Sequence, residues 1–231
     1  MEYLATLKHV FIDGNRYYYI IQGLSFSLGV TCFSTVLGVL LGILLALMRL
    51  STVSVPNTKI NPFNIFATAY IDLFRGTPVV VQLMILANLV FVGVLKDVPI
   101  FFIAGITFGL NSGAYVAEII RSGVTNLDKG QMDAARALGM NYSVAMREVI
   151  MPQVIKKILP TLVNEFITLI KETSVVGFIG GVDLLRSANI ITSQTYRGIE
   201  PLLLVGIIYL ILIATFTKFM RKIEESFKAS D

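Results

Sequence analysis

Long apolar stretches alternate with short polar ones along the chain. Five are long enough to be membrane spans, at about residues 20–48, 62–95, 99–122, 153–176 and 201–220. An α-helix rises about 1.5 Å per residue, so about 20 residues cross a hydrocarbon core of roughly 30 Å. The pattern therefore predicts an all-α integral membrane protein, with five transmembrane helices in a single domain over residues 1–231.

The segments that flank these spans are polar or interfacial in character. Residues 1–19 hold apolar side chains at helical spacing and end in three tyrosines, which predicts a short interfacial helix with an aromatic belt on the outer face. Residues 50–59 contain Ser, Thr, Asn and Pro and predict a short cytoplasmic connection. Residues 177–199 are rich in glycine and polar residues, which indicates an outer loop with a short helix.

The second apolar stretch contains a predicted break. Asn61 and Pro62 suit the cap and the first turn of its helix. Further along, Gly76 loosens a turn and Pro78 removes a backbone hydrogen bond, so we expect the helix to stop near the middle of the membrane. Lipid tolerates such a break only where protein or water satisfies the freed backbone groups, and transporters place solute sites there.

Polar residues form a stripe on each of the third and fourth apolar stretches. In both stripes the residues recur at i, i+4, i+7 and i+11, a spacing that places them on one face of a helix. This arrangement predicts helices that share a polar pathway. The two stripes are Asn111, Tyr115, Glu118 and Ser122, and then Thr161, Glu165, Thr168 and Glu172.

The polar stretch at residues 131–152 separates the third and fourth spans. Its first part is helix-forming, and Gly139 then offers the positive φ at which a short helix can stop and turn. Asn141 suits the cap of a second short helix, which would run until Pro152 at the first turn of the next span. The stretch therefore predicts two short helices at an angle to each other.

Composition excludes an ordinary soluble domain. The chain is 55% hydrophobic and only 15% charged, with a mean hydropathy of +0.76. One cysteine and one histidine exclude a disulfide framework and argue against a zinc site. The sequence contains no GxxxxGK[ST] phosphate loop, so energy for transport must come from a partner or an ion gradient. We expect a transport subunit rather than an enzyme.

The distribution of lysine and arginine predicts the orientation of the chain. With the N-terminus outside and the C-terminus in the cytoplasm, twelve of these residues lie in inner segments and five in outer ones. This bias agrees with the positive-inside rule and places residues 131–152 in the cytoplasm. The inner residues are Arg49, Lys59, Arg121, Lys129, Arg136, Arg147, Lys156, Lys157, Lys218, Arg221, Lys222 and Lys228; the outer residues are Lys8, Arg16, Lys96, Arg186 and Arg197.

The polar stretch carries a recognisable motif. Asp133-Ala134-Ala135, then Gly139 and finally Pro152, resemble the EAA loop of ABC importer permeases, with Asp133 in place of the usual Glu. Two further departures, Val149 for Ile and Met151 for Leu, keep the apolar character. The stretches RGTPVVVQL (75–83), NSGAYVAEIIRSG (111–123) and KETS (171–174) resemble the polar amino acid branch of that family. The resemblance covers nearly the whole chain.

This resemblance implies a type I ABC importer-like fold and a set of partners. It implies a permease in the bacterial plasma membrane that works as a homo- or heterodimer with two copies of an ABC ATPase, which bind ATP and magnesium. An extracytoplasmic solute-binding protein would deliver the amino acid for import. The loop would be the coupling helix that docks on the ATPase, through Asp133, Ala134, Ala135, Gly139 and Pro152. The loop pattern alone also fits an interfacial amphipathic linker.

Charged groups at membrane depth are costly and usually face a cavity, so they are candidates for solute binding. Arg75 could bind the carboxylate of an amino acid, and Glu118 or Glu165 its ammonium group. Two structural alternatives stay open, an ion pair of Arg75 with Asp72 and one of Glu118 with Arg121. The remaining candidates are hydrogen-bonding residues: Thr77, Gln82, Asn111 and Tyr115.

A gradient-driven secondary amino acid carrier is the alternative function. It would use Glu118 or Glu165 as a proton site. Carriers of that kind commonly contain inverted repeats, and this chain has five apolar stretches without an internal repeat, which argues against the alternative.

Overall fold

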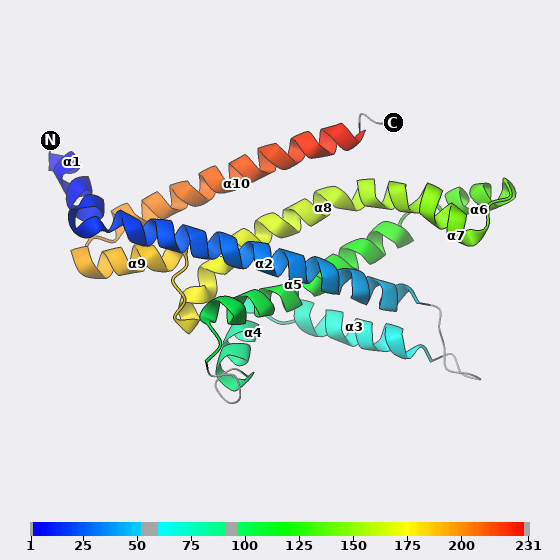
Figure 1. Cartoon of the computed structure of the whole chain (residues 1–231), viewed down its shortest axis with the longest axis horizontal. Coiled ribbons are helices and arrows are strands. Elements are labelled where there is room, and N and C mark those ends of the chain that lie inside the picture. The colour runs from blue at the N-terminus through cyan, green and yellow to red at the C-terminus, as the bar shows by residue number, and fades with distance from the viewer. Residues whose placement is uncertain (1, 52–59, 91–96, 229–231) are drawn as a thin grey trace.

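The computed structural model describes residues 2–51, 60–90 and 97–228, and this part of the chain is helical with short connections and no strand (Figure 1). The helices are, in order, α1 (Glu2–Leu7), the π-turn η1 (Lys8–Ile12), η2 (Asp13–Asn15), α2 (Tyr17–Leu50), α3 (Pro62–Arg75), α4 (Val79–Ile85), η3 (Leu86–Val90), α5 (Ile100–Thr125), α6 (Lys129–Ala137), α7 (Tyr142–Ala145), η4 (Met146–Ile150), α8 (Met151–Glu172), η5 (Thr173–Ile179), α9 (Leu184–Thr195) and α10 (Ile199–Lys228).

Three helices are long and apolar enough to cross a membrane by themselves: Tyr17–Leu50, Ile100–Thr125 and Ile199–Lys222. Two bent pairs of helices bring the number up to five if each pair is counted as one span. The pair at residues 62–89 bends by 102°, and the pair made by residues 142–179 and 184–195 bends by 47°. Three of the five predicted spans match continuous helices, and the second and fourth fall within the two bent pairs.

The central contact of the bundle joins α2 to α5 through glycines on both helices. A Cβ added at Gly38 would lie 2.9 Å from the Cβ of Ser112, and one added at Gly42 would lie 2.5 Å from Val116. On the opposite side of the contact, Gly109 lies against Leu37. Glycine at these positions removes the side chain that would hold the helices apart, so the backbones approach closely.

The predicted break in the second apolar stretch is confirmed. Asn61 caps α3, its side chain accepting a hydrogen bond from the backbone N–H of Asn64 at 3.0 Å. The helix ends at Arg75, and α4 begins at Val79 after Pro78. Because of the 102° bend, α4 does not continue the direction of α3. Residues 91–95 of the predicted span lie outside the described part.

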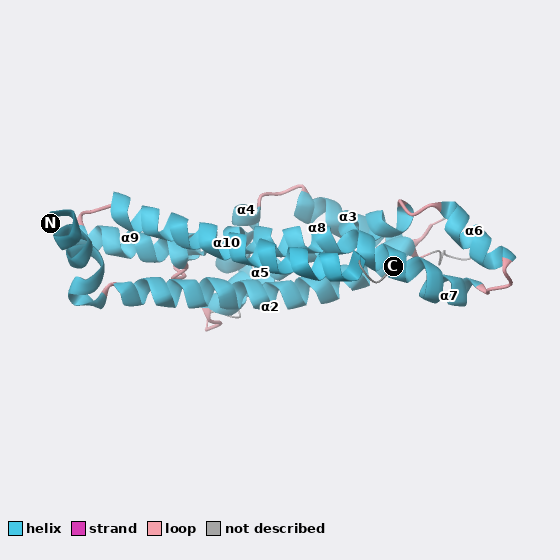
Figure 2. Cartoon of the chain, turned by 90° about the horizontal axis from the view of Figure 1, so that it is seen from above, coloured by secondary structure: helices cyan, strands magenta, loops and turns pink. Residues whose placement is uncertain are grey.

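The loop at residues 131–152 contains one separate short helix, not two. The helix α6 ends at a turn with Gly139 at φ 88°, as predicted, and Asn141 caps α7 by accepting from the N–H of Val144 at 2.9 Å. From α7 onward, however, the helix runs through η4 directly into α8 (Figure 2). Pro152 lies in the first turn of α8, as predicted, but the second short helix is not separate from α8, because the π-turn at Met146–Ile150 joins the two without a break.

Residues 177–199 form more structure than the outer loop predicted for them. The 3-10 helix η5 ends at Gly180, with φ 87°, and α9 follows. Leu184, Ala188 and Ile191 on α9 are fully buried and pack in a cluster with residues of α2 and α10. Because the apolar face of α9 is buried against α2 and α10, α9 is part of the helix bundle and not a helix on an exposed loop.

The N-terminal segment folds back onto the same cluster. Val10, in η1, is fully buried against α9 and α10, whereas Leu4 in α1 is 71% exposed. Figure 1 places this segment and α9 at one end of the elongated molecule, and α6 and α7 at the other. The last helix, α10, runs from the first end toward the second.

Candidate functional site

A polar cavity of about 500 Å³ lies where the end of α3 meets α5 and α8. Both polar stripes contribute to its wall, together with residues near the C-terminal end of α5. Its volume is within the range of about 300–1,000 Å³ that is usual for small-molecule sites. The lining residues are Arg75, Tyr115, Glu118, Ile119, Ser122, Gly123, Asn126, Lys157, Ile158, Thr161, Asn164, Glu165 and Thr168.

Arg75 enters this cavity from the last turn of α3. Its guanidinium carbon lies 5.4 Å from the centroid of the Tyr115 ring, which is the geometry of a cation–π contact. The alternative pair with Asp72 is not observed, because Arg75 forms no ion pair with any residue that the structure describes. A tyrosine ring thus orients the guanidinium while its donors face the cavity.

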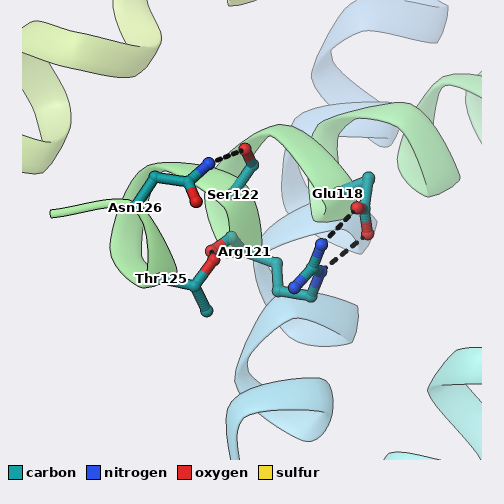
Figure 3. A network of polar contacts seen from close by, with 5 residues as sticks. All are labelled: Glu118, Arg121, Ser122, Thr125 and Asn126. Carbon is teal, nitrogen blue, oxygen red and sulfur yellow. Dashed lines mark hydrogen bonds and ion pairs between the residues drawn. The ribbon is translucent and has the colours of Figure 1, made fainter.

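Glu118 does not offer a free carboxylate, because Arg121 occupies both of its oxygens (Figure 3). Arg121 Nε donates to one oxygen at 2.9 Å and Arg121 Nη2 to the other at 2.6 Å. The predicted structural pair at i, i+3 is therefore confirmed. A bidentate pair of this kind neutralises the carboxylate, and Glu118 contributes less charge to the cavity than its position implies.

Glu165 is the carboxylate that remains available on the opposite wall. One of its oxygens accepts a hydrogen bond from Ser112 Oγ at 2.9 Å, and Ser112 is only 1% exposed in the contact between α2 and α5. In the described part of the chain, no lysine or arginine forms an ion pair with Glu165. The cavity therefore presents a guanidinium group from α3 and a carboxyl group from α8.

The helix break is closed by side chains that were predicted to bind solute. Gln82 Nε2 donates to the carbonyl oxygens of Phe74 at 2.8 Å and Thr77 at 3.0 Å. Asn111 reaches across from α5 and donates to Gln82 Oε1 at 2.9 Å and to the Phe74 carbonyl at 3.2 Å. Thr77 in turn donates to Leu73. These bonds satisfy the backbone groups that the break leaves free.

The structure thus separates the predicted solute-binding residues into two groups. Arg75, Tyr115, Glu118 and Glu165 lie together on the cavity wall. Thr77, Gln82 and Asn111 lie beside it, in the network that holds the break. Asn111 and Gln82 are 3% and 8% exposed, so their amide groups are committed to the protein.

Sequence reasoning missed other cavity residues, chiefly Asn126, Lys157 and Asn164. Asn126 follows Ser122 at i+4 and continues the stripe on α5, but the predicted span stops at residue 122. Asn164 follows Thr161 at i+3 on the stripe of α8, so the same periodicity could have found it. Lys157 carried no such signal, because a lysine near the inner end of a span is expected to reach the interface.

The loop that resembles the EAA motif presents an exposed tip. Gly139 N–H donates to the Arg136 carbonyl at 3.0 Å and Met140 N–H to the Ala135 carbonyl at 3.2 Å, the two bonds of a Schellman motif. Ala135 is buried at 4% exposure, whereas Leu138 is 81% exposed. Asp133, Ala134 and Pro152 are also exposed. The turn therefore holds an apolar side chain outward at the end of the molecule.

Residues 38–228 match the family model described as "Binding-protein-dependent transport system inner membrane component". The arginine transport system permease protein ArtQ of Bacillus subtilis (strain 168) is 39% identical over 92% of this chain and 94% of its own length. The putative glutamine transport system permease protein GlnP of Rickettsia bellii (strain RML369-C) is 36% identical over 90% and 92% of the two chains.

Solved structures share the fold. A structure described as an amino acid ABC transporter with histidines matches with a TM-score of 0.82 at 40% identity, over 96% of this chain and 97% of its own. The MetNI methionine ABC transporter in an inward-facing conformation matches with a TM-score of 0.74. It is only 17% identical, over 91% of this chain and 96% of its own, so that likeness concerns the fold alone.

The chain belongs to the family of inner membrane components of binding-protein-dependent transport systems, the permeases of ABC importers. The resemblance drawn from Asp133-Ala134-Ala135, Gly139 and Pro152 is thereby confirmed, together with the type I ABC importer-like fold. It is a multi-pass protein of the bacterial plasma membrane.

Proposed function

We propose that this chain forms the amino acid pathway of an ATP-driven importer. It would act as one of two permease subunits, with two copies of an ABC ATPase that bind ATP and magnesium and an extracytoplasmic solute-binding protein that delivers the solute. The names of its relatives support an amino acid as solute, and those relatives include arginine and glutamine permeases. These two amino acids are therefore the first to test.

The observation that carries the proposal is the placement of two opposite charges in one cavity. Arg75 and Glu165 line the same space, and neither forms an ion pair with a described residue. An amino acid at neutral pH carries one carboxylate and one ammonium group, so it complements both walls at once. Tyr115 and Asn164 add hydrogen-bonding groups between them.

The exposed loop supports the coupling half of the proposal. Leu138 at the tip is 81% exposed and Tyr142 is 58% exposed. The region of α6 and α7 lies at one end of the molecule (Figure 1). An exposed apolar tip on rigid short helices suits docking into a groove of a cytoplasmic subunit. The charge distribution supports an N-terminus outside and a C-terminus in the cytoplasm, which places this loop on the side of ATP.

Reconstitution tests the whole function. The permease and its ATPase would be placed in proteoliposomes with ATP on the ATPase side and binding protein with labelled arginine or glutamine on the other. We expect uptake that requires ATP, is stopped by vanadate and is insensitive to a protonophore. Uptake that follows a proton gradient and ignores vanadate would favour the gradient-driven carrier and contradict the proposal.

Gly139→Val tests the loop separately. A β-branched side chain disfavours the left-handed conformation at φ 88°, and no atom lies within 4 Å of a Cβ placed there, so the effect comes from the turn and not from crowding. We expect ATP hydrolysis to continue while solute uptake falls. Normal uptake in this variant would contradict the coupling role of the turn.

A further inference from the structure

The corner between α5 and α6, residues 126–131, is fastened to α8 at two points. Lys157 Nζ donates to the backbone carbonyl oxygen of Asn126 at 2.8 Å, and Gln153 Nε2 donates to Gln131 Oε1 at 3.2 Å. Lys157 and Gln153 are four residues apart, so both project from one face of α8. One contact holds the end of α5, and the other holds the beginning of α6.

The two helices are also in close contact beside this corner. A Cβ added at Gly123 on α5 would clash with Ile158 Cγ2 and lie 3.3 Å from Val154 Cγ1 on α8. Any side chain at Gly123 would therefore push α8 away. Close packing together with the two hydrogen bonds makes the end of α5, the corner and the first turns of α8 one mechanical unit.

This unit joins the cavity to the loop. On one side, Asn126 ends α5 and its side-chain amide donates to Ser122 Oγ at 2.9 Å, and both residues line the cavity (Figure 3). On the other side, α8 continues without interruption from the helix that starts at Tyr142. A displacement of the loop can therefore reach the cavity wall through helices alone.

We propose that Lys157 is the positioning residue that couples the loop to the inner wall of the cavity. By holding the Asn126 carbonyl, its ammonium group makes α5 follow α8 when an ATPase moves the loop. This inference rests on the proposed docking of the loop to an ATPase. Without the contact, α8 moves past α5. ATP hydrolysis then no longer moves the part of α5 that carries Ser122 on the cavity wall.

The chemistry of the contact suits a cation. The last carbonyls of a helix have no partner within the helix and carry partial negative charge, so a lysine or arginine near them is favoured. Lys157 contacts only the backbone oxygen of Asn126, so this contact depends on the charge at position 157 and not on the side chain at position 126.

The test compares substitutions at position 157 in the reconstituted complex. Lys157→Met keeps the length of the side chain and removes its donor. We expect at least a fivefold fall in solute molecules taken up per ATP hydrolysed, with the ATPase rate within twofold and the Tm of the complex within a few degrees of wild type. Lys157→Arg, which can still donate to the carbonyl, should restore the ratio to within twofold.

Thr125→Ala is the matched control, because it removes a neighbouring side chain of α5 that is not among the residues lining the cavity and leaves the Asn126 carbonyl that Lys157 contacts. Its coupling ratio should stay within twofold of wild type. An unchanged ratio in Lys157→Met contradicts the proposal, and so does a raised KM at an unchanged ratio, which would assign Lys157 to the solute site. Failure of both Lys157→Met and Lys157→Gln to assemble would make the residue purely structural. Absence of ATP-driven uptake in the wild-type complex would instead contradict the proposed function itself.

Discussion

The two helix breaks of this permease are built differently. The break between α3 and α4 is closed by groups from two helices, with Asn111 of α5 reaching across to Phe74 and Gln82. The break between η5 and α9 is closed mainly within its own segment, since Asp183 accepts from the N–H groups of Gly177 at 2.6 Å and Arg186 at 2.9 Å. One distant contact adds to these, from the Leu184 N–H to Ser27 Oγ of α2 at 3.1 Å. The freed backbone groups are thus satisfied by a distant helix at the first break and mostly by local groups at the second.

The breaks also differ in the charge that they leave available. Asp183 is fully buried, and backbone donors occupy both of its carboxylate oxygens. At the first break the charged residue, Arg75, is exposed on the cavity wall, where it forms a cation–π contact with Tyr115 and no ion pair with a described residue. A break whose charged side chain has no ion-pair partner is suited to bind solute. A break whose charged side chain is fully hydrogen-bonded to the backbone stabilises the fold instead. Substitutions at each break can test this distinction.

The largest expected effect is at Arg75. Arg75→Lys replaces a planar, bidentate donor with a point charge, so it should weaken solute binding to the complex by about ten- to hundredfold, or roughly 1.5–3 kcal/mol. Solute binding to the detergent-solubilised complex measures this. An amino acid whose carboxylate is amidated is the control, because it should bind the wild type poorly and lose little more in the variant. Equal losses for acid and amide would contradict a carboxylate site.

Asp183→Ala should affect stability and not solute affinity. The substitution removes the N-cap of α9 and leaves the N–H of the half-buried Gly177 without its partner, which should cost about 1–3 kcal/mol of folding free energy. Thermal unfolding of the solubilised complex and its yield after gel filtration measure the effect. A large change in solute affinity with unchanged Tm would show that the second break also belongs to the solute pathway.

Asn111→Leu should weaken the first break from a distance. It removes two interhelical hydrogen bonds that average about 0.6 kcal/mol each in membrane proteins, so we expect a loss of about 1 kcal/mol of stability. Thr107→Val is a suitable comparison, because Thr107 is equally buried but its hydroxyl donates only within its own helix, to Ile103. A tenfold loss of solute affinity in Asn111→Leu with unchanged Tm would show that Asn111 contributes to solute binding, as the sequence predicted.

Pro78→Ala should have the smallest effect. Proline restricts the unfolded chain, so its loss costs about 0.4–1 kcal/mol, but the hydrogen bonds of Gln82 and Asn111 still hold the break. We expect nearly normal uptake. If this variant instead abolished transport, the proline would be the element that maintains the break, and the network would be secondary.

Local chemistry made some features predictable. Gly76 and Pro78 predicted the first break, and Gly139 and Asn141 predicted the turn in the loop. The i, i+3 spacing predicted the ion pair of Glu118 and Arg121. In each case the residues that decide the structure lie within one or two helical turns of one another. Spacing in the sequence is then close to spacing in the fold.

Features that depend on distant partners could not be predicted in the same way. The stripe correctly placed Asn111 on the polar face of its helix. Periodicity, however, does not show that the Asn111 amide donates its hydrogen bonds to Gln82 and Phe74. The same limit applies to α9, whose polar residues suggested a loop. Its buried face contacts Ile20 and Val205, which lie far away along the chain. The π-turn before Pro152 was missed because nothing in the residue types distinguishes it from a helix end.

The glycine contact between α2 and α5 has a consequence for how the protein is made. Gly38 and Ser112 are separated by 74 residues. At about 5–20 residues per second, the ribosome therefore needs roughly 4–15 s after α2 emerges before its partner exists. During that interval the glycine face of α2 is in the bilayer or the insertion machinery without the helix that fits it. Biogenesis of this permease thus includes a stage at which α2 has been synthesised but cannot yet pack against α5.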